Sequence, residues 1–299
     1  MKPFEKSTKF IKGTQIRVRD PALGAVHRRA SPTTIAAIKS LPEKMLDIVQ
    51  IPVLMDNYIY LVHEPGSSET AVVDPAVAEP VLDVLAERGW SLDYILNTHH
   101  HGDHVGGNLE LKRKTGCRIV GSGADSARIP GIDIKLDEGE RFKLGNAETQ
   151  IIAVSGHTCG HIAYWFRDDN VLFCGDTLFA LGCGRLFEGT PAQMWNSLSK
   201  LKGLPAETRI YCAHEYTQTN GRFALTVEPE NRALQQRMAQ VDRLRSRDLS
   251  TVPSTLAEEL ATNPFLRVDS PEIQKTLSNN SDDPVDLFAE IRRRKDRFR

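Results

Sequence analysis

The sequence of 299 residues lacks the features of a membrane-spanning or disulfide-rich secreted protein. No apolar run approaches the ~20 residues that a helix needs to cross a bilayer, and we find no secretory apolar core, internal repeat or low-complexity tract. The five cysteines are odd in number and include no C-x-x-C pair, which fits a reducing compartment better than a disulfide framework. The net charge of −1 and the 40% of apolar residues are ordinary for a globular protein. We therefore expect a cytoplasmic protein, monomeric by default, without a membrane partner.

The charge is unevenly distributed along the chain. The first 44 residues contain ten Lys or Arg against three acidic residues, a net charge of +7. The remainder therefore carries about −8, which offers little for phosphate and indicates no nucleic-acid partner. Three interpretations of residues 1–44 stay open: a mitochondrial or plastid transit peptide, a native basic arm, or a stretch upstream of a true start at Met45.

The most informative stretch is Thr98–His104, whose sequence T-H-H-H-G-D-H offers several metal-ligating side chains within one turn. It follows the apolar segment Tyr94–Asn97, which we expect to be a strand, and precedes Gly106–Leu109, where we expect a helix to begin. Imidazole and carboxylate groups are good ligands for zinc and similar divalent ions. One structural site would not need so many ligands from a single turn, so the pattern H-x-H-x-D-H predicts two metal ions side by side.

Three further side chains that could bind a metal ion follow strand-like segments later in the chain: His157, Asp176 and His214. The sequence then offers five histidines and two aspartates for two ions. We predict the following assignment: His99, His101 and His157 for one ion, Asp103, His104 and His214 for the other, and Asp176 bridging both. The open positions would hold a shared water or hydroxide, as catalytic rather than structural sites do.

The other histidines receive a plainer interpretation. A single histidine after a strand is more often a capped or core residue than a ligand, and we assign His27, His63 and His100 to that class. His161 we assign to a supporting position beside the ligands. The ligand set is complete without thiols, so we interpret the neighbouring cysteines as small packing residues: Cys159, Cys174 and Cys183.

Strand-like and helical segments alternate up to about Gln218, which favours an α/β layered architecture. The predicted strands are Ile48–Val53, Tyr58–His63, Thr70–Asp74, Tyr94–Thr98, Arg118–Gly121, Thr149–Val154, Ile162–Phe166, Val171–Cys174 and Arg209–Cys212. The predicted helices are Val77–Arg88, Gly107–Lys114, Pro191–Leu201, Glu230–Arg247 and Pro284–Phe298, the last with Asp283 as N-cap. After Gln218 we expect no strands. The pattern predicts an α/β domain over residues 45–217 and a smaller helical domain over residues 218–299.

Taken together, the motifs resemble those of the metallo-β-lactamase superfamily and, within it, the glyoxalase II or hydroxyacylglutathione hydrolase family. Five segments carry the resemblance: Thr98–Asn108, Gly175–Phe179, Gly182–Gly189, His214–Thr217 and Arg292–Asp296. The metal motif is shared across the superfamily, whereas Gly182–Gly189 and the basic C-terminal segment point to the narrower family. The resemblance covers nearly the whole chain from Met45. It implies an αββα sandwich followed by a smaller helical domain, and a dinuclear thioester hydrolase. It also implies a catalytic role for the first domain, residues 45–217, and substrate binding for the second, residues 218–299.

The implied reaction is hydrolysis of S-D-lactoylglutathione, and of related S-2-hydroxyacylglutathiones, to glutathione and D-lactate, the second step of methylglyoxal detoxification. Two ions ~3.5–4 Å apart would hold a bridging hydroxide, because coordination lowers the pKa of water to about 7. In the implied reaction this hydroxide would attack the thioester carbonyl, and one ion would stabilise the oxyanion. We assign catalytic roles to Asp176, between the ions, and to Asp103, which orients the hydroxide. The ligand types favour Zn²⁺, with iron or manganese as alternatives.

The resemblance also implies which residues bind glutathione. Arg292 and Lys295 lie three apart on one helix face and match the family's basic pair for the glycine carboxylate. Arg185 and Phe187 stand where family members carry a Lys and often a Tyr, so the charge is kept with another geometry and the hydroxyl is missing. Tyr216 matches the remaining family tyrosine.

Four alternatives stay open at this point. A lactonase or β-lactamase-like enzyme of the same fold would not be expected to carry the Arg292–Lys295 helix. An iron persulfide dioxygenase would use fewer ligands than the seven present. A nucleic-acid-processing enzyme would need a broad basic surface. A non-catalytic binding protein would not need all seven metal-ligating residues.

Overall fold

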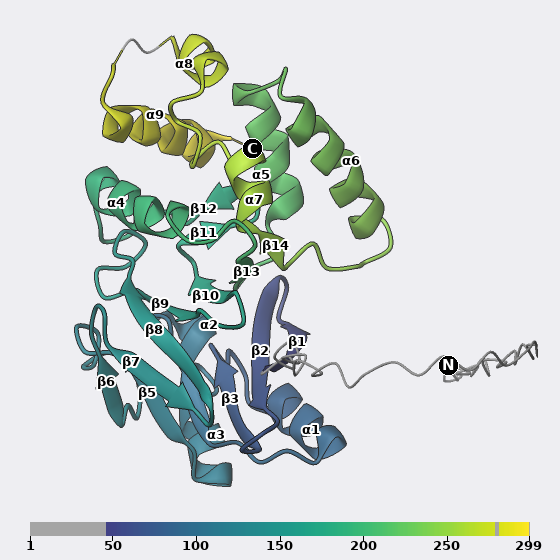
Figure 1. The fold of residues 1–299 in the computed structure, drawn as a ribbon, viewed down its shortest axis with the longest axis vertical. Helices are drawn as coiled ribbons and strands as arrows, with labels where there is room; N and C mark the ends of the chain where they lie inside the picture. Colours follow the sequence, from purple (N-terminus) through teal and green to yellow (C-terminus); the bar gives the residue numbers. More distant parts are fainter. Residues whose placement is uncertain (1–45, 279–280, 299) are drawn as a thin grey trace, which may run out of the picture. The chain divides into compact units, whose positions relative to one another are not determined.

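The structure is a computed structural model that describes residues 46–278 and 281–298. The predicted basic extension over residues 1–44, with His27 and the Met45 start, lies outside the described residues. Two six-stranded sheets stack face to face, with helices on their outer faces (Figure 1). No helix among the described residues has the length and hydropathy of a membrane span.

The first sheet has the order β1-β2-β3-β4-β5-β6 and changes from antiparallel to parallel pairing at β3. Its strands are β1 (Asp47–Val53), β2 (Asn57–Glu64), β3 (Glu69–Val73), β4 (Tyr94–Leu96), β5 (Arg118–Ser122) and β6 (Ile134–Leu136). Every residue of β2 is buried. Because successive side chains of a strand point to opposite faces, Tyr60 and Val62 enter the core between the sheets while Ile59 and Leu61 face the outer helices.

The second sheet has the order β14-β13-β10-β9-β8-β7 and is antiparallel except for the parallel pair β10–β13. Its strands are β7 (Arg141–Leu144), β8 (Ala147–Ala153), β9 (Ile162–Phe166), β10 (Val171–Gly175), β13 (Arg209–Cys212) and β14 (Ser254–Thr255). A separate hairpin of β11 (Leu178–Phe179) and β12 (Gly182–Cys183) follows β10.

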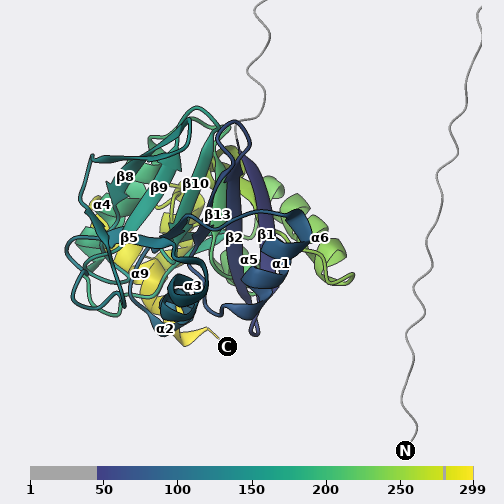
Figure 2. The ribbon, with the colours of Figure 1, turned by 90° about the horizontal axis from the view of Figure 1, so that it is seen from below.

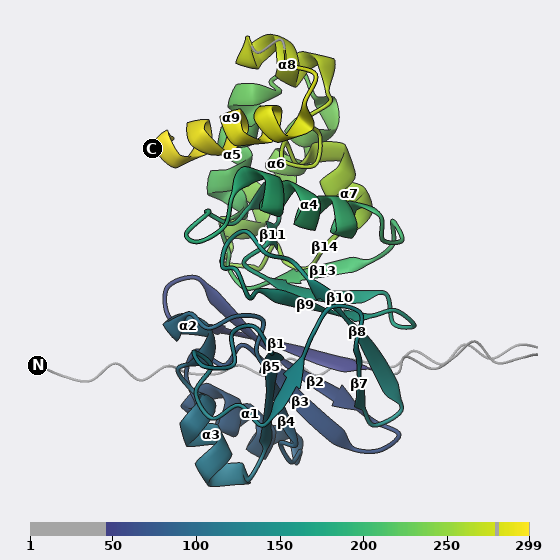
Figure 3. The same ribbon diagram turned by 90° about the vertical axis from the view of Figure 1, so that its left-hand side faces the viewer.

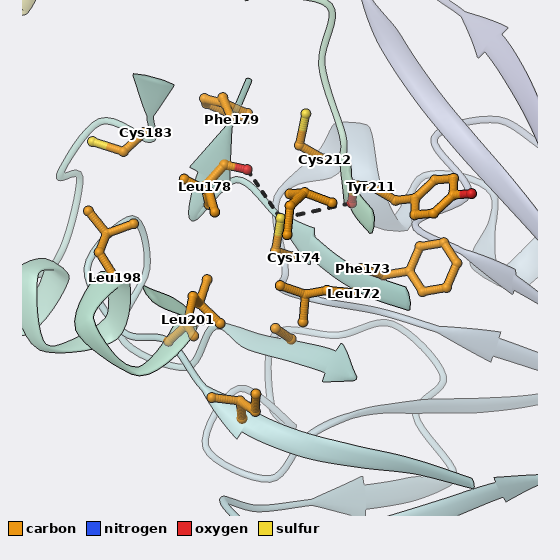
Figure 4. Close-up of a cluster of buried hydrophobic side chains, with 14 of the residues drawn as sticks. Leu172, Phe173, Cys174, Leu178, Phe179, Cys183, Leu198, Leu201, Tyr211 and Cys212 are labelled. Atoms are coloured by element: carbon orange, nitrogen blue, oxygen red, sulfur yellow. Dashed lines mark hydrogen bonds between the residues drawn. The ribbon is translucent and has the colours of Figure 1, made fainter. Parts of the chain in front are cut away.

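The outer face of the first sheet is covered by α1 (Glu79–Arg88) and α3 (Asn108–Thr115), which stand in front of it in Figure 2. A single turn of helix, α2 (Gly102–Val105), precedes α3. On the other side, α4 (Pro191–Lys202) packs Leu198 and Leu201 into the core that contains Leu172 and Leu178 (Figure 4). Thr190 and Gln193 form a capping box that starts α4.

The C-terminal helices gather beyond the second sheet (Figure 3). They are α5 (Thr217–Val227), α6 (Arg232–Arg245), α7 (Leu256–Thr262), α8 (Pro271–Leu277) and α9 (Pro284–Arg297). The predicted start of α9 is confirmed, because Asp283 accepts a hydrogen bond from the backbone N–H of Val285 and Pro284 occupies the first position. Trp195 of α4 lies against Phe288 of α9, with 6.3 Å between the ring centroids, which links the helical layer to the sandwich.

The αββα sandwich followed by helices is confirmed, and every predicted strand and helix is present with small shifts at its ends. One expectation is wrong: strands do not stop at Gln218, because β14 pairs with β13 at the edge of the second sheet. A strand of two residues is too short to show the alternation on which the prediction depended. The strand predicted to reach Thr98 ends at Leu96, where the metal motif turns away from the sheet.

Candidate metal centre and substrate cleft

The seven predicted ligands all lie in segments that follow strands, and the fold brings them to one end of the sandwich. The loop after β4 supplies His99, His101, Asp103 and His104, and the segments after β8, β10 and β13 supply His157, Asp176 and His214. The backbone before Asp176 passes so close to the Thr98 side chain that only glycine fits at position 175. Gly175 has a positive φ of 48°, and a Cβ there would lie 2.3 Å from the Thr98 hydroxyl oxygen.

Three histidines form one cluster, which we call the three-histidine group: His99, His101 and His157. Nδ1 of His101 lies 3.0 Å from Nε2 of His99 and 3.1 Å from Nε2 of His157. Burial and the neighbouring imidazoles hold the pKa of His99 well below its usual value, so its lone pair stays available.

The second cluster, which we call the aspartate–histidine group, contains Asp103, His104 and His214. The Oδ2 atom of Asp103 lies 3.6 Å from Nε2 of His104 and 3.5 Å from Nε2 of His214. Asp176 lies between the two clusters. Its Oδ2 is 3.3 Å from Nε2 of His157, while its Oδ1 is 3.3 Å from Nε2 of His214 and 3.6 Å from Nε2 of His104. Each oxygen of this carboxylate therefore faces a different group.

The donor set fits divalent metal ions. His104 Nε2 and Asp176 Oδ1 are buried and have no hydrogen-bond partner among the described residues, an arrangement that costs ~1–3 kcal/mol for each group when nothing binds it. Although burial opposes ionisation, the nearby His104 and His214 hold the pKa of Asp176 far below its usual value, so it is a carboxylate. Imidazole nitrogens and carboxylates facing common points are the ligand set of zinc and similar ions.

Two further carboxylates orient the histidines of the aspartate–histidine group. Nδ1 of His104 donates to Asp74 at 3.0 Å, and Nδ1 of His214 donates to Asp56 at 2.8 Å. Such partners fix the ring orientation and leave Nε2 free for a metal. Sequence reasoning missed both residues. Asp74 directly follows β3, so the rule that found the ligands at strand ends would also have found it.

The remaining described histidines do not join either cluster. His63 contacts the Thr70 hydroxyl and stacks on Trp90, as a core histidine does. His161 is fully buried, stacks on His99 and accepts a hydrogen bond from the backbone N–H of Asp176, which agrees with its supporting position. His100 points to Asp125, with 2.9 Å between Nδ1 and Oδ2.

A cleft of about 440 Å³ opens from His157 and Asp176. All five residues that the resemblance implied for substrate binding line it: Arg185, Phe187, Tyr216, Arg292 and Lys295. Sequence reasoning assigned no binding role to the other lining residues, of which the first two lie in the motifs Gly175–Phe179 and Gly182–Gly189 and the rest in no motif: Phe179, Cys183, Thr219, Asn220 and Phe298. Cys183 is therefore more than a packing residue. Cys159 is exposed, so the packing interpretation is wrong for it, whereas Cys174 is buried against Leu178 as expected (Figure 4).

The far wall of the cleft is cationic and comes mainly from α9. Arg292 is only 5% exposed and donates to the carbonyl oxygen of Cys183 at 2.9 Å. Lys295, one turn later, lies over the rings of Phe223 and Phe298 at 5.7 and 5.5 Å. Burial, with the nearby Arg292 and Arg185, lowers the pKa of Lys295 to about 8.

Two aromatic residues flank the metal ligands. Phe187 lies edge-on to His157, with 5.2 Å between ring centroids, and its side chain is exposed to the cleft. Tyr216 stacks on His214 at 4.8 Å. Burial and the nearby carboxylates raise the pKa of Tyr216 to about 12, so its hydroxyl stays protonated.

Comparison with known proteins agrees with this architecture. Residues 53–214 match the family model of the metallo-beta-lactamase superfamily, and residues 215–298 match that of the hydroxyacylglutathione hydrolase C-terminus. ETHE1 from Myxococcus xanthus has the same fold, with a TM-score of 0.59, 24% identity, and coverage of 85% of this chain and 100% of that one. TTHA1623 in a di-iron-bound form has a TM-score of 0.54 at 25% identity, with 74% of this chain and 100% of that one covered.

The fold and the two ligand clusters define a metal-dependent hydrolase of the metallo-beta-lactamase superfamily. The hydroxyacylglutathione hydrolase of Methylococcus capsulatus is 64% identical over 85% of this chain and 100% of its own length, and that of Rhodospirillum rubrum is 54% identical over 85% and 99%. The chain belongs to the hydroxyacylglutathione hydrolase family. These relatives do not favour the lactonase or the iron persulfide dioxygenase that the sequence left open.

Proposed function

We propose that the protein hydrolyses the thioester of S-D-lactoylglutathione, and of related S-2-hydroxyacylglutathiones, to glutathione and the free hydroxy acid. One observation carries the proposal: the carboxylate between the two ligand clusters opens onto a cleft whose far wall is cationic. Glutathione carries two carboxylates, so such a wall suits it. The names of the relatives support the same substrate class.

The proposed ligands are those of the two clusters. His99, His101 and His157 would hold one divalent ion, and Asp103, His104 and His214 the other, with Asp176 shared. We propose Zn²⁺, with iron or manganese as alternatives, because all three accept this ligand set. The di-iron form of TTHA1623 supports a pair of ions in this fold. Two bound ions supply an activated water at neutral pH and positive charge for the carbonyl oxygen.

The protein's own residues orient that chemistry. Asp176 is ionised, and its two oxygens face different clusters, so it keeps the ligands of both in register. Asp103 accepts a hydrogen bond from the side-chain amide of Asn57 at 3.1 Å, which holds this carboxylate in place, and it would orient the attacking water. No side-chain nucleophile is needed: burial raises the pKa of Cys183 to about 11, so this thiol stays protonated. The glutathione thiolate leaves readily, since a thiol pKa near ~8.5 makes it a stable leaving group.

The far wall would bind the glutathione moiety. Arg292 and Lys295 face the cleft from successive turns of α9 and would bind the glycine carboxylate, while Arg185 adds charge near the loop after β12. The Tyr216 hydroxyl would donate a hydrogen bond, and Phe187 offers only an apolar contact. We propose that residues 45–217 supply the metal side together with Arg185, Phe187 and Tyr216, and that residues 218–299 supply the cations of α9 on the glutathione side. Five free cysteines support a reducing compartment such as the cytoplasm.

Thioester hydrolysis by purified protein tests the proposal. The loss of S-D-lactoylglutathione is followed before and after chelation, and again after Zn²⁺ is restored. We expect rapid hydrolysis that the chelator abolishes and zinc recovers. Absence of turnover by metal-loaded protein would contradict the proposed function, and turnover that survives complete metal removal would contradict the proposed metal chemistry.

A further inference from the structure

A cluster of charged side chains lies behind the three-histidine group. We call it the charged cluster, and it consists of His100, Asp125, Arg128 and Glu188. These residues come from three separate segments: the loop after β4, the loop between β5 and β6, and the loop after β12. None of them belongs to the ligand set or lines the cleft.

Arg128 is the centre of the cluster. Its guanidinium donates to both oxygens of Glu188, at 3.2 Å for the Nη2–Oε2 pair, and Nη2 also donates to Asp125. A guanidinium that forms two parallel hydrogen bonds to a carboxylate fixes the orientation of the two side chains as well as the distance between them. The hydrogen bond from Arg128 holds the pKa of Glu188 at about 2, so the pair stays charged at neutral pH.

The inner end of the cluster is Asp125, which is only 1% exposed. It accepts from Arg128 and from Nδ1 of His100, which stands between the ligands His99 and His101 in the sequence. The loop that carries His157 packs directly on this carboxylate, since a Cβ at Gly160 would lie 2.2 Å from its Cγ atom. Asp125 therefore contacts both loops that supply the three-histidine group.

The outer end of the cluster is Glu188, which reaches the same two loops. Its Oε2 accepts a hydrogen bond of 2.7 Å from the backbone N–H of Cys159, two residues after His157. Its Oε1 lies 3.7 Å from Nε2 of His100. The loop after β12 is tied to His157 a second time, because the backbone N–H of Phe187 donates to the His157 carbonyl oxygen at 3.2 Å.

The two ligand groups differ in how they are supported. In the aspartate–histidine group, Asp56 and Asp74 accept directly from the outer nitrogens of the ligands. In the three-histidine group, the outer Nδ1 of His157 faces the carbonyl oxygen of Arg185 at 2.9 Å, and that of His99 faces the Thr98 hydroxyl at 3.1 Å. Among the described residues, no carboxylate accepts directly from these two outer nitrogens. Their partners are a backbone carbonyl and a hydroxyl that itself donates to Asp74 at 2.6 Å.

We propose that the charged cluster positions the three-histidine group, with the Arg128–Glu188 pair joining the loop of His99 and His101 to the loop of His157. Its residues are positioning residues, because they touch neither substrate nor metal. The proposal rests on the ligand assignment given above. Loss of the pair would loosen the relative placement of these loops, and the affinity of the three-histidine group for its ion would fall. The aspartate–histidine group, with its own carboxylates, would be little affected.

The test is a Zn²⁺ titration of the metal-free full-length protein against a competing chelator, which gives a dissociation constant for each group. The two constants are assigned by repeating the titration in the Asp103→Ala background, where the aspartate–histidine group lacks one ligand and its constant should weaken. For Glu188→Gln and Arg128→Met we expect the affinity of the three-histidine group to fall about 10- to 100-fold, the range for residues that support metal ligands. The other constant should change less than about threefold. Asp56→Asn should show the opposite pattern.

The controls separate positioning from general stability. Arg141→Met breaks the exposed Arg141–Glu148 pair on β7 and β8 and should leave both constants unchanged. Arg128→Lys keeps the charge and should restore part of the affinity that Arg128→Met loses. Equal weakening of both groups, or a lower melting temperature with unchanged zinc affinities, would overturn the proposal. If the unmodified protein bound no zinc and hydrolysed no thioester, the proposed function itself would fail, which is a distinguishable result.

Discussion

The two walls of the cleft are built in different ways. The metal wall, made of the seven ligands, comes from segments at strand ends of a sandwich, and most of its side chains are buried. The glutathione wall, made of Arg185, Phe187, Tyr216, Arg292 and Lys295, comes from loops and from the last helix. Phe187 is 63% exposed, whereas His99 is fully buried. The proposed metal ligands are therefore mostly buried in the fold, whereas the proposed glutathione wall is on the whole more exposed.

This difference predicts how substitutions on the two walls act. Changes in the metal wall should remove the reactive group and affect the turnover number. Changes in the glutathione wall should weaken contacts that the substrate makes equally in the ground state and in the transition state. They should therefore mainly raise KM. The following predictions test that division.

Removal of a ligand should have the largest effect. His101→Ala and Asp176→Ala should each reduce kcat by more than about 100-fold, since loss of a supporting partner alone costs about 10- to 100-fold. Metal content, measured on the purified variants, should fall together with activity. Asp168→Ala, at an exposed aspartate, is the control and should keep both. Full activity in either ligand variant would remove the basis for a shared pair of ions.

Loss of the cation on α9 should act on the other wall. Lys295→Met should raise KM about 10-fold with little change in kcat, because a hydrogen bond to a charged group contributes about 1.5–3 kcal/mol and solvent reaches this half-buried site. Arg293→Met is the matched control, since Arg293 lies on the same helix but is exposed and pairs with Glu290. Steady-state kinetics with S-D-lactoylglutathione give both constants. A fall in kcat with unchanged KM would contradict the division between the walls.

The same lysine should make binding sensitive to pH. Its pKa is lowered to about 8, so the cationic form that binds a carboxylate predominates below pH 8 and is lost above it. KM should be nearly constant below pH 7 and rise roughly fivefold by pH 9. The cationic fraction of a group that titrates near 8 falls about tenfold between these values, and the neutral lysine should bind about tenfold more weakly, as the methionine variant does. In Lys295→Arg this rise should disappear, because the guanidinium stays charged. A rise of equal size in the arginine variant would assign the effect to another group.

The sequence predicted that the seven proposed ligands would lie together, because the information for this is local. Four of the ligands stand in one motif, and the others each follow a strand, so periodicity and residue type were sufficient. Asp56 was not predictable in this way. It reaches His214 only because Asn57 and His214 form a β-bridge, so that the turn after β1 meets the end of β13. The charged cluster was missed for the same reason, since Arg128 and Glu188 are 60 residues apart.

The prediction of the glutathione wall depended on the family resemblance more than on residue spacing. Arg292 and Lys295 share a face with ordinary helical spacing, and an arginine-rich terminal helix is usually just solvated. What distinguishes them is tertiary: Arg292 is buried against the Cys183 carbonyl, while Arg293 beside it is exposed. Residues such as Asn220 and Phe298 enter the cleft through helix packing, for which the sequence carries no separate signal.

Phe187 gives the smallest and most specific comparison between the walls. It lies at their junction, edge-on to His157 and exposed to the cleft, and it lacks the hydroxyl that the resemblance associates with this position. Phe187→Tyr should lower KM about threefold, within the ~0.5–1.5 kcal/mol net value of one hydrogen bond, and leave kcat nearly unchanged. Phe187→Leu, which adds no hydroxyl, should not lower KM. A higher kcat with unchanged KM would show that this residue acts on the reaction rather than on binding. Phe187 would then belong to the metal wall.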